Sequence, residues 1–356
     1  MSLTPILRSA VITIFRRIGY NIIMISNFIS GRAIIMGFCV LGLLFLYSDL
    51  GFINGFLPEV VVTMIEKPIP TDVSYSSRKS SDYATPEVSH NMTDYELQTI
   101  SENLFKNDVN NAGKYVLINY QGKAQSKSKV DFAQEPLLIV KNDVWNIPTI
   151  SAMRALYDNY ERNSKIEETV TSQELNEEII FLNAVMATPL MGYLMSVLTD
   201  KGLVPNDYKE QREYLRNMWF ELYPRSKGKL TSSGFEHVFL SEIKRGKISG
   251  LHNWLYFFTQ EESKHANYLG YFNKIDLKEN NSIIKMTFIL DGIQKAVGSM
   301  FVAFSPELEM ALYSLCFITR PNRRCPLSIA GQTFPIKTYT LKHEGKSLIG
   351  SAFPDI

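Results

Sequence analysis

The chain has 356 residues, enough for one large domain or two modest ones; 45% of them are hydrophobic and 21% are charged. These are ordinary values for a globular protein and exclude an extreme composition, while the net charge of +1 excludes an overall basic or acidic excess. The charge is nevertheless uneven, because residues 225–356 carry 17 basic and 11 acidic side chains. This local positive charge suits a polyanion site, although a solvated basic face would give the same count.

The N-terminal region contains an uncharged apolar segment at residues 33–47, and apolar character continues in diluted form to Leu57. Residues 33–57 are therefore long enough to span a bilayer as a tilted transmembrane helix. Four arginines precede this segment, so by the positive-inside rule residues 1–32 stay cytoplasmic. We expect an uncleaved signal-anchor of a type II single-pass membrane protein, with the rest luminal or extracellular. A cleaved signal peptide, which gives a secreted protein, and a buried core helix are the alternatives.

Residues 58–90 are expected to form a flexible stalk. From residue 66 the sequence is rich in Ser, Pro and Thr and poor in large aliphatic side chains. Sequons begin at Asn91 and at Asn280, and both are open to glycosylation if this part of the chain is translocated.

Residues 91–229 have the pattern of a mostly helical region. Capping boxes at Thr93–Glu96 and Thr171–Glu174 predict two helix starts. After the second box a run of apolar residues at helical spacing continues until Asp200-Lys-Gly202, which predicts a single long helix. Asn206 can cap a further helix.

Residues 230–356 change to period two, which is typical of strands. The sequence GFEHVFLSEIK predicts a strand with His237 on one face and Glu236 and Glu242 on the other, followed by a turn at Arg245-Gly-Lys247. Pro306 opens a short helix. Further strands are predicted at 284–290, 299–304, 327–330, 334–341 and 347–353. The fold class is therefore α+β, with helices first and antiparallel strands afterwards.

Two of the three cysteines, Cys316 and Cys325, lie nine residues apart with a Pro-Asn turn between them. If this region faces an oxidising compartment, the two can form a disulfide across the turn. Two buried thiols are the alternative in a reducing compartment.

The chain has five histidines, and two of them, His237 and His252, lie close together in apolar surroundings. Taken alone, His237 is explained at least as well by a structural role, as a hydrogen-bonded histidine on a half-buried strand, as by a catalytic one. His252 precedes a helical stripe that Ser249-Gly250 could cap, which would place it in the first helical turn. There the positive helix end lowers the pKa of the imidazole, as a general base requires.

Two imidazoles and one lysine are enough to cleave RNA without metal chemistry. One ring takes a proton from the ribose 2′-OH, the other protonates the departing 5′ oxygen, and the ammonium stabilises charge on phosphorus. DNA lacks this hydroxyl and cannot react in this way. Spacing alone does not identify the lysine, which leaves Lys285, Lys295 and Lys337 as candidates.

Several stretches resemble the EndoU family of poly(U)-specific endoribonucleases, which is related to a coronaviral uridylate-specific endoribonuclease. They are SSGFEHVFLSEIKRGKISGLHNW, KAVGSMFVAFSPELEMALYSLCFITRPNRRCPLSI and KTYT, with YELQTISENLF, ALYDNYE, FLNAVMATPLM and LRNMWFELYPRSKG upstream. The resemblance covers about residues 90–356 and implies an EndoU-like domain at 91–356, with a helical part at 91–229 and a catalytic β-rich part at 230–356. It also implies cleavage of single-stranded RNA at uridylates, leaving 2′,3′-cyclic phosphate and 5′-OH ends.

The resemblance implies a role for each matching residue. His237 corresponds to the general acid, His252 to the base and Lys295 to the catalytic lysine. Supporting roles, structural or metal-linked, are implied for Glu236 and Glu242. The substrate-binding positions are Gly250 through its backbone N–H, Ser299 at the uracil, Tyr339 on the nucleotide, and Thr338 or Thr340 as hydrogen-bond partners.

The resemblance also implies manganese, since family members depend on Mn²⁺ or respond to calcium, although no metal motif is recognisable in the sequence. We expect a monomer that binds U-containing RNA and a membrane. A metallohydrolase with Glu236, His237, Glu242 and His252 as ligands is one alternative, and a non-catalytic RNA-binding or membrane-associated scaffold is another.

Overall fold

The computed structural model describes residues 92–125, 130–225 and 228–356. The described residues all belong to one compact unit. The predicted cytoplasmic segment at 1–32, signal-anchor at 33–57, stalk at 58–90 and sequon residue Asn91 lie outside the described residues.

The described unit is α+β, as predicted, with helices followed by antiparallel sheets. Its first half contains α4 (Asp94–Lys106), α5 (Pro148–Arg154), α6 (Ser172–Met186), α7 (Pro189–Asp200) and α8 (Tyr208–Phe220), together with a small hairpin of β1 (Val116–Ile118) and β2 (Leu138–Val140). Short 3₁₀ helices cover Gly113–Tyr115 and Asn142–Asn146. The β1–β2 hairpin was not expected, since the sequence of this half reads as helical.

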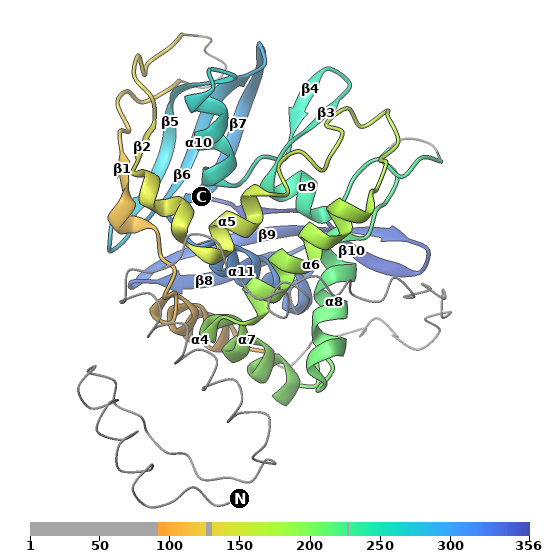
Figure 1. Ribbon diagram of the computed structural model, residues 1–356. Coiled ribbons are helices and arrows are strands. Elements are labelled where there is room, and N and C mark those ends of the chain that lie inside the picture. The colour runs from red at the N-terminus through yellow and green to blue at the C-terminus, as the bar shows by residue number, and fades with distance from the viewer. Residues whose placement is uncertain (1–91, 126–129, 226–227) are drawn as a thin grey trace, which may run out of the picture. The chain divides into compact units, whose positions relative to one another are not determined.

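The second half begins with α9 (Gly234–Phe239), the hairpin of β3 (Glu242–Lys244) and β4 (Lys247–Ser249), and α10 (Trp254–Glu262). One antiparallel sheet follows, made of β5 (Ala266–Asp276), β6 (Ser282–Leu290) and β7 (Ile293–Val302). After α11 (Pro306–Thr319) comes the second, made of β8 (Arg324–Ile329), β9 (Gln332–His343) and β10 (Lys346–Pro354). Figure 1 shows the strands of the two sheets running in different directions, with α9 beside β10.

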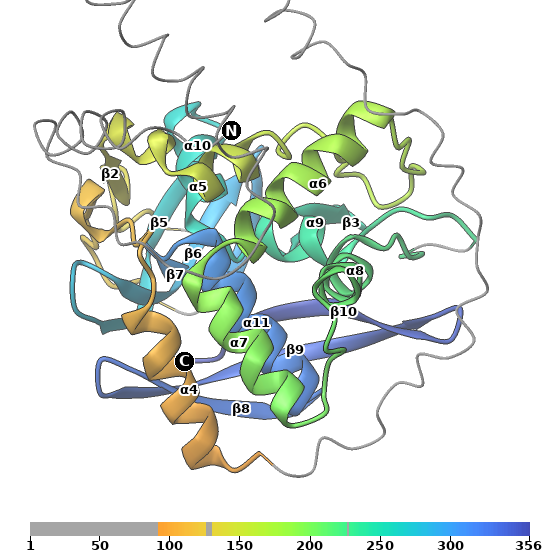
Figure 2. The same cartoon turned by 60° about the horizontal axis from the view of Figure 1, so that its bottom comes forward.

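Helix α11 packs against β9 and β10, and α4 lies along the edge strand β8, where the Ser101 hydroxyl bonds the backbone of Ser328. Helix α7 packs against both helices (Figure 2). A cluster of buried apolar side chains is continuous through these layers. Its aromatic part includes Phe235, which stacks on Phe220 and Phe239 with ring centroids 4.9 and 5.0 Å apart. The face of the sheet opposite α11 is thereby left for the functional side chains.

Several local predictions are confirmed. Both capping boxes form, at Thr93 and at Thr171. The turn after β3 has Arg245 and Gly246 at positive φ, and α11 begins at Pro306. The predicted strands at 284–290, 299–304, 327–330, 334–341 and 347–353 all overlap observed ones, whereas β5 was not predicted.

The predicted single helix after Thr171 is wrong, because it breaks into α6 and α7 with a bend of 80°. Thr188 caps the second helix and Pro189 opens it, and proline in a helix interior would remove a hydrogen bond and clash with the preceding turn. The N-cap of α8 is Asp207, not Asn206. By length and hydropathy, the bent pair α6–α7 matches a broken membrane span, and none of the described helices does so alone.

The predicted strand around His237 is also wrong. Residues 234–239 form α9, and the hydroxyl of Ser233 accepts a hydrogen bond from the Glu236 N–H as its N-cap. All six residues of α9 are buried, so the alternation of polar and apolar side chains did not mark a solvent face. His252 lies outside a helix, because α10 begins at Trp254 and is capped by Asn253 rather than by Ser249-Gly250.

Cys316 on α11 and Cys325 on β8 form a disulfide, with 5.6 Å between their Cα atoms. The link joins the helix to the edge strand of the sheet it covers. The side chain of Asn280, the other sequon residue, donates a hydrogen bond to the carbonyl of Gly113.

Candidate active site

His237 lies in α9 with both ring nitrogens engaged. Its Nδ1 is 2.7 Å from Oε2 of Glu242, and its Nε2 is 3.2 Å from the hydroxyl of Ser351 on β10. The expectation that Glu242 points away from His237 is therefore wrong. Because residue 237 is helical and 242 begins the next strand, period-two alternation does not relate them.

Glu242 is an ionised carboxylate in a fully buried position. Burial alone would raise its pKa, but His237, Arg225 and Ser232 together lower it from 4.5 to about 2. One carboxylate oxygen accepts from Nε of Arg225 at 3.0 Å and from the Ser232 hydroxyl, and the other faces His237. The carboxylate therefore holds a proton on Nδ1 of His237 and directs Nε2 to the site.

His252 is held against α9 by backbone hydrogen bonds. The N–H of Leu251 donates to the carbonyl of His237 at 3.1 Å, and the N–H of His252 donates to that of Val238 at 2.8 Å. The ring stacks on Phe353, with centroids 5.1 Å apart. Since Nδ1 is 2.7 Å from the carbonyl of Ser299, which can only accept, Nδ1 carries the proton and Nε2 is free to accept one.

Both imidazoles are biased towards the neutral form. Burial lowers the pKa of His252 well below its ordinary value, and the charges of Lys295 and His237 lower it further. The hydrogen bond to the Ser299 carbonyl acts in the opposite direction and raises the pKa. Burial also lowers the pKa of His237, although Glu242 opposes this effect. The predicted direction for His252 is therefore confirmed, but its cause is burial and a neighbouring ammonium rather than a helix end.

The two rings face one space, with centroids 6.4 Å apart. Lys295 joins them from β7, where two residues, Ala296 and Val297, oppose one residue of β6 in a β-bulge. Bulges re-aim side chains beside active sites. Burial lowers the pKa of Lys295 to about 8 against the influence of Glu242, so the amine remains largely charged at neutral pH.

The amines of the other two lysine candidates contact groups other than the histidines. Nζ of Lys285 donates to the carbonyl of Ile356 at 2.6 Å. Nζ of Lys337 lies 5.0 Å from the ring centroid of Tyr339. Of the three candidates, Lys295 is the one whose charge acts on both histidines.

Gly250 allows the approach of the segment carrying His252 to α9. Its φ is +73°, and a Cβ there would lie 1.8 Å from the carbonyl oxygen of His237. The predicted backbone donation of Gly250 to a phosphate remains a prediction.

Replacing Gly250 with alanine is expected to lower activity and to destabilise the fold by about 2 kcal/mol or more, because the Cβ adds a backbone clash to the cost of a positive φ. Gly246→Ala is the matched control, since its φ is +70° and a Cβ there meets nothing within 4 Å. It should cost only about 1 kcal/mol. Urea unfolding and initial rates measure both, and equal effects of the two substitutions would contradict this account.

Glu236 is buried, and neither of its carboxylate oxygens has a hydrogen-bond partner in the described residues. Burial, with Glu242 and Glu168 nearby, raises its pKa well above the ordinary value, which favours the protonated carboxyl. The expectation that Glu236 points away from His237 rested on the incorrect strand and has no basis in α9.

The variant Glu236→Gln is expected to match the wild type in stability at low pH and to exceed it as pH rises. A raised folded-state pKa means that wild-type stability is fully present below the unfolded pKa and is lost as pH passes the folded one, by at most about 1.4 kcal/mol per pH unit. Urea unfolding from pH 5 to 9 measures the difference. A gap between the two proteins that does not depend on pH would show that Glu236 is charged in the native state.

The predicted substrate-binding residues separate into two groups. Ser299 lies at the site, where its carbonyl accepts from His252 and its hydroxyl donates to Pro354 at 2.6 Å. Tyr339 is 41% exposed and lies 6.2 Å from Phe353 between ring centroids. Thr338 alternates to the opposite, buried face, and Thr340 is engaged with Asn322, so the structure brings neither hydroxyl to the site.

Four contributing residues were not predicted: Arg225, Ser232, Ser351 and Phe353. Ser351 and Phe353 alternate on β10 and so share a face, which the strand pattern could have indicated once one of them was placed. Arg225 and Ser232 carry no sequence signal, because their roles depend on a buried carboxylate that only the fold places between them.

The donor side chains of the described residues do not form a manganese site. In the described part of the chain, no three His, Cys, Asp or Glu side chains form a group that could hold a metal ion. The ligand set proposed for a metallohydrolase, Glu236, His237, Glu242 and His252, is thus not assembled. Glu242 and Nδ1 of both histidines already have protein partners.

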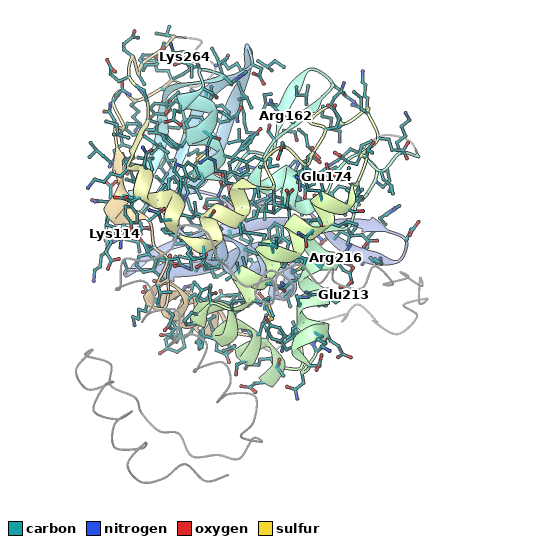
Figure 3. The ribbon with its side chains drawn as sticks, viewed as in Figure 1. Lys114, Arg162, Glu174, Glu213, Arg216 and Lys264 are labelled. Atoms are coloured by element: carbon teal, nitrogen blue, oxygen red, sulfur yellow. A yellow bond between two sulfur atoms is a disulfide. The ribbon has the colours of Figure 1, made fainter. Side chains whose placement is uncertain are left out.

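Beside Arg162 the segment before α6 runs along β3 (Figure 3). Arg162 donates to the hydroxyl of Ser241, next to Glu242, and forms an ion pair with Asp291 at 2.6 Å. The start of β3, which carries Glu242, is thus tied to the β6–β7 turn, and the carboxylate is held in place from outside the site.

Two buried imidazoles, one facing a carboxylate and both near an ammonium, have the groups of an acid–base site. The chain belongs to the Endoribonuclease XendoU family, whose model matches residues 96–354.

Curated relatives include the uridylate-specific endoribonucleases of Bos taurus and Mus musculus, which are 39% and 38% identical over 274 residues. The matches cover 74% of this chain and 65% and 66% of those proteins, so the chain spans about two thirds of their length. A solved structure is described as XendoU, a splicing-independent snoRNA-processing endoribonuclease. It is 30% identical, with a TM-score of 0.61, covering 73% of this chain and 96% of that one.

Proposed function

We propose that this chain is an endoribonuclease that cuts single-stranded RNA on the 3′ side of uridylates. The observation that carries the proposal is the pair of imidazoles 6.4 Å apart beside the amine of Lys295. At this separation one ring can lie at the 2′ oxygen and the other at the 5′ oxygen of one phosphodiester. The names of the curated relatives support the choice of uridylate.

In this mechanism Nε2 of His252 accepts the proton of the 2′-OH, because its Nδ1 is committed to a carbonyl and its pKa is low. The 2′ oxygen forms a bond to phosphorus and the bond to the 5′ oxygen breaks. His237 acts in its imidazolium form, with a proton on each ring nitrogen, and gives the Nε2 proton to that oxygen. The Glu242 carboxylate at Nδ1 stabilises this charged form against the burial that favours the neutral ring. The products are a 2′,3′-cyclic phosphate and a 5′-OH end, and Lys295 stabilises the charge that develops on the phosphoryl oxygens.

The proposal includes a membrane anchor at residues 33–57, a luminal or extracellular catalytic domain and a monomeric state. These rest on the sequence pattern alone. Manganese remains a proposal from the family resemblance. Bound manganese would supply positive charge beside a phosphate, and no step above is assigned to it.

The proposal predicts that replacing the target uridine by 2′-deoxyuridine abolishes cleavage, because the attacking nucleophile is removed. The full chain is incubated with a U-containing oligonucleotide and with its deoxy counterpart, with and without Mn²⁺, and the product ends are analysed. Cleavage of the deoxy substrate, or a product without a cyclic phosphate, would indicate water as the nucleophile. No cleavage of either would favour a non-catalytic RNA-binding scaffold.

A further inference from the structure

The face of the β8–β10 sheet opposite α11 continues away from the histidines. Residues opposite one another on paired strands share a face, and Phe353, Lys337 and Arg324 are direct partners across β10, β9 and β8. Phe353 stacks on His252, so the row begins at the catalytic ring. It ends at Arg324 on the edge strand, where 67% of the side chain is exposed.

The next row on the same face holds Tyr339 opposite Ser351, whose hydroxyl contacts His237. Nζ of Lys337 lies 5.0 Å from the centre of the Tyr339 ring, so cation and ring are adjacent at the surface. Arg324 pairs with Asp355 through Nε at 3.3 Å and reaches the Asp355 carbonyl through one terminal nitrogen. The guanidinium has five N–H donors, so this pair leaves others for a ligand.

Aromatic rings and cations side by side on a sheet face form the pattern that binds single-stranded nucleic acid, in which bases stack and phosphates meet positive charge. We propose that Lys337 and Arg324 bind the phosphates of the RNA on the 5′ side of the target uridine. We call this surface the upstream track; it consists of Phe353, Tyr339, Lys337 and Arg324.

The polarity follows from the roles of the two histidines and therefore rests on the proposed function. His252 acts at the 2′-OH, which belongs to the nucleotide on the 5′ side of the broken bond. Since the row of Phe353, Lys337 and Arg324 begins at His252 rather than at His237, it leads towards the upstream nucleotides. Adjacent strands are about 4.8 Å apart, so the row extends roughly 10 Å beyond β10.

The test uses the full chain and two RNA oligonucleotides with 2′-deoxyuridine at the target position, one extended only on the 5′ side and the other only on the 3′ side. Fluorescence anisotropy gives Kd for each at several salt concentrations. The double variant Lys337→Gln, Arg324→Gln is expected to bind the 5′-extended RNA several-fold more weakly. Its slope of log Kd against log salt should fall by about 1.4, or about 0.7 for each lost phosphate contact.

The matched control is Lys342→Gln, an exposed lysine on the same strand that bonds to Ser347 and is not part of the upstream track. It should leave both affinities and both slopes unchanged. An unchanged affinity of the double variant for 5′-extended RNA would overturn the proposal, as would an equal loss on both oligonucleotides. Cleavage of the all-ribose substrate by the wild type is measured in parallel, so that failure of the proposed function is seen separately.

Discussion

His252→Ala is expected to reduce kcat by a factor of about 10² to 10⁴, the usual contribution of one positioned general base. Nε2 of this ring is the acceptor that the Ser299 contact leaves free. The acid limb of the wild-type pH–rate profile should lie below pH 6.5, since the pKa of His252 is lowered, and it should disappear in the variant. Single-turnover cleavage of a U-containing oligonucleotide across pH 4.5–9 measures both effects.

Two companion variants separate catalysis from folding. His265→Ala removes a histidine whose side chain is 60% exposed, and it should leave kcat unchanged. His252→Asn keeps an N–H that can donate to the Ser299 carbonyl and so preserves much of the packing, yet it lacks a basic nitrogen. If His252→Asn folds and retains wild-type kcat, residue 252 is not the base.

Glu242→Gln is expected to lower both stability and activity. Its pKa of about 2, against 4.5 in the unfolded chain, corresponds to roughly 3 kcal/mol of stability at neutral pH. Because the folded pKa is the lower one, this stability is present above about pH 4.5 and is lost as pH falls towards 2. Urea unfolding of variant and wild type at pH 7 and pH 4 should therefore show a gap that narrows in acid.

The activity loss has a separate cause. Arg225 and Ser232 both donate to one oxygen of Glu242, so glutamine would place its carbonyl there and turn its amide towards Nδ1 of His237. An amide donor at Nδ1 moves the proton to Nε2 and disfavours the imidazolium, and loss of an orienting carboxylate of this kind can cost up to about 10⁴ in kcat. Glu242 is thus a positioning residue.

Glu221→Gln is the control for Glu242, because it breaks a partly exposed ion pair with Lys346 away from the histidines. It should change the free energy of unfolding by no more than about 1 kcal/mol and leave the pH profile intact. A Glu242→Gln protein with a wild-type pH–rate profile would contradict the proposed orientation of His237.

The local predictions that hold are those whose physical cause lies within a few residues. A capping box needs one hydroxyl and one carboxylate three residues apart, and it forms at Thr93 and Thr171. The turn at Arg245-Gly246 likewise depends on its own backbone. The pairing of Cys316 with Cys325 spans only the end of α11 and the start of β8. The identities of the two histidines and Lys295 came from motifs, not from spacing.

The predictions that fail depend on what surrounds a segment. The period-two pattern around His237 indicates a strand only if one face meets solvent, and α9 is buried on every side. The sequence placed Thr338 and Tyr339 together at the substrate. Because side chains alternate along a strand, the Thr338 hydroxyl is buried and the Tyr339 ring is exposed on the opposite face.

The sequence by itself therefore determined the α+β class, the local helix caps and the residue types of an acid–base site. Only the tertiary structure decided that Glu242 faces His237, that a β-bulge precedes Ser299 and places Lys295, and which nitrogen of each imidazole carries the proton. The physical reason is the distance along the sequence between the groups that interact. Capping and turns are settled by neighbours along the chain, whereas burial, bulges and buried hydrogen bonds are settled by segments distant in sequence, which contribute the desolvation and the partners that set each pKa.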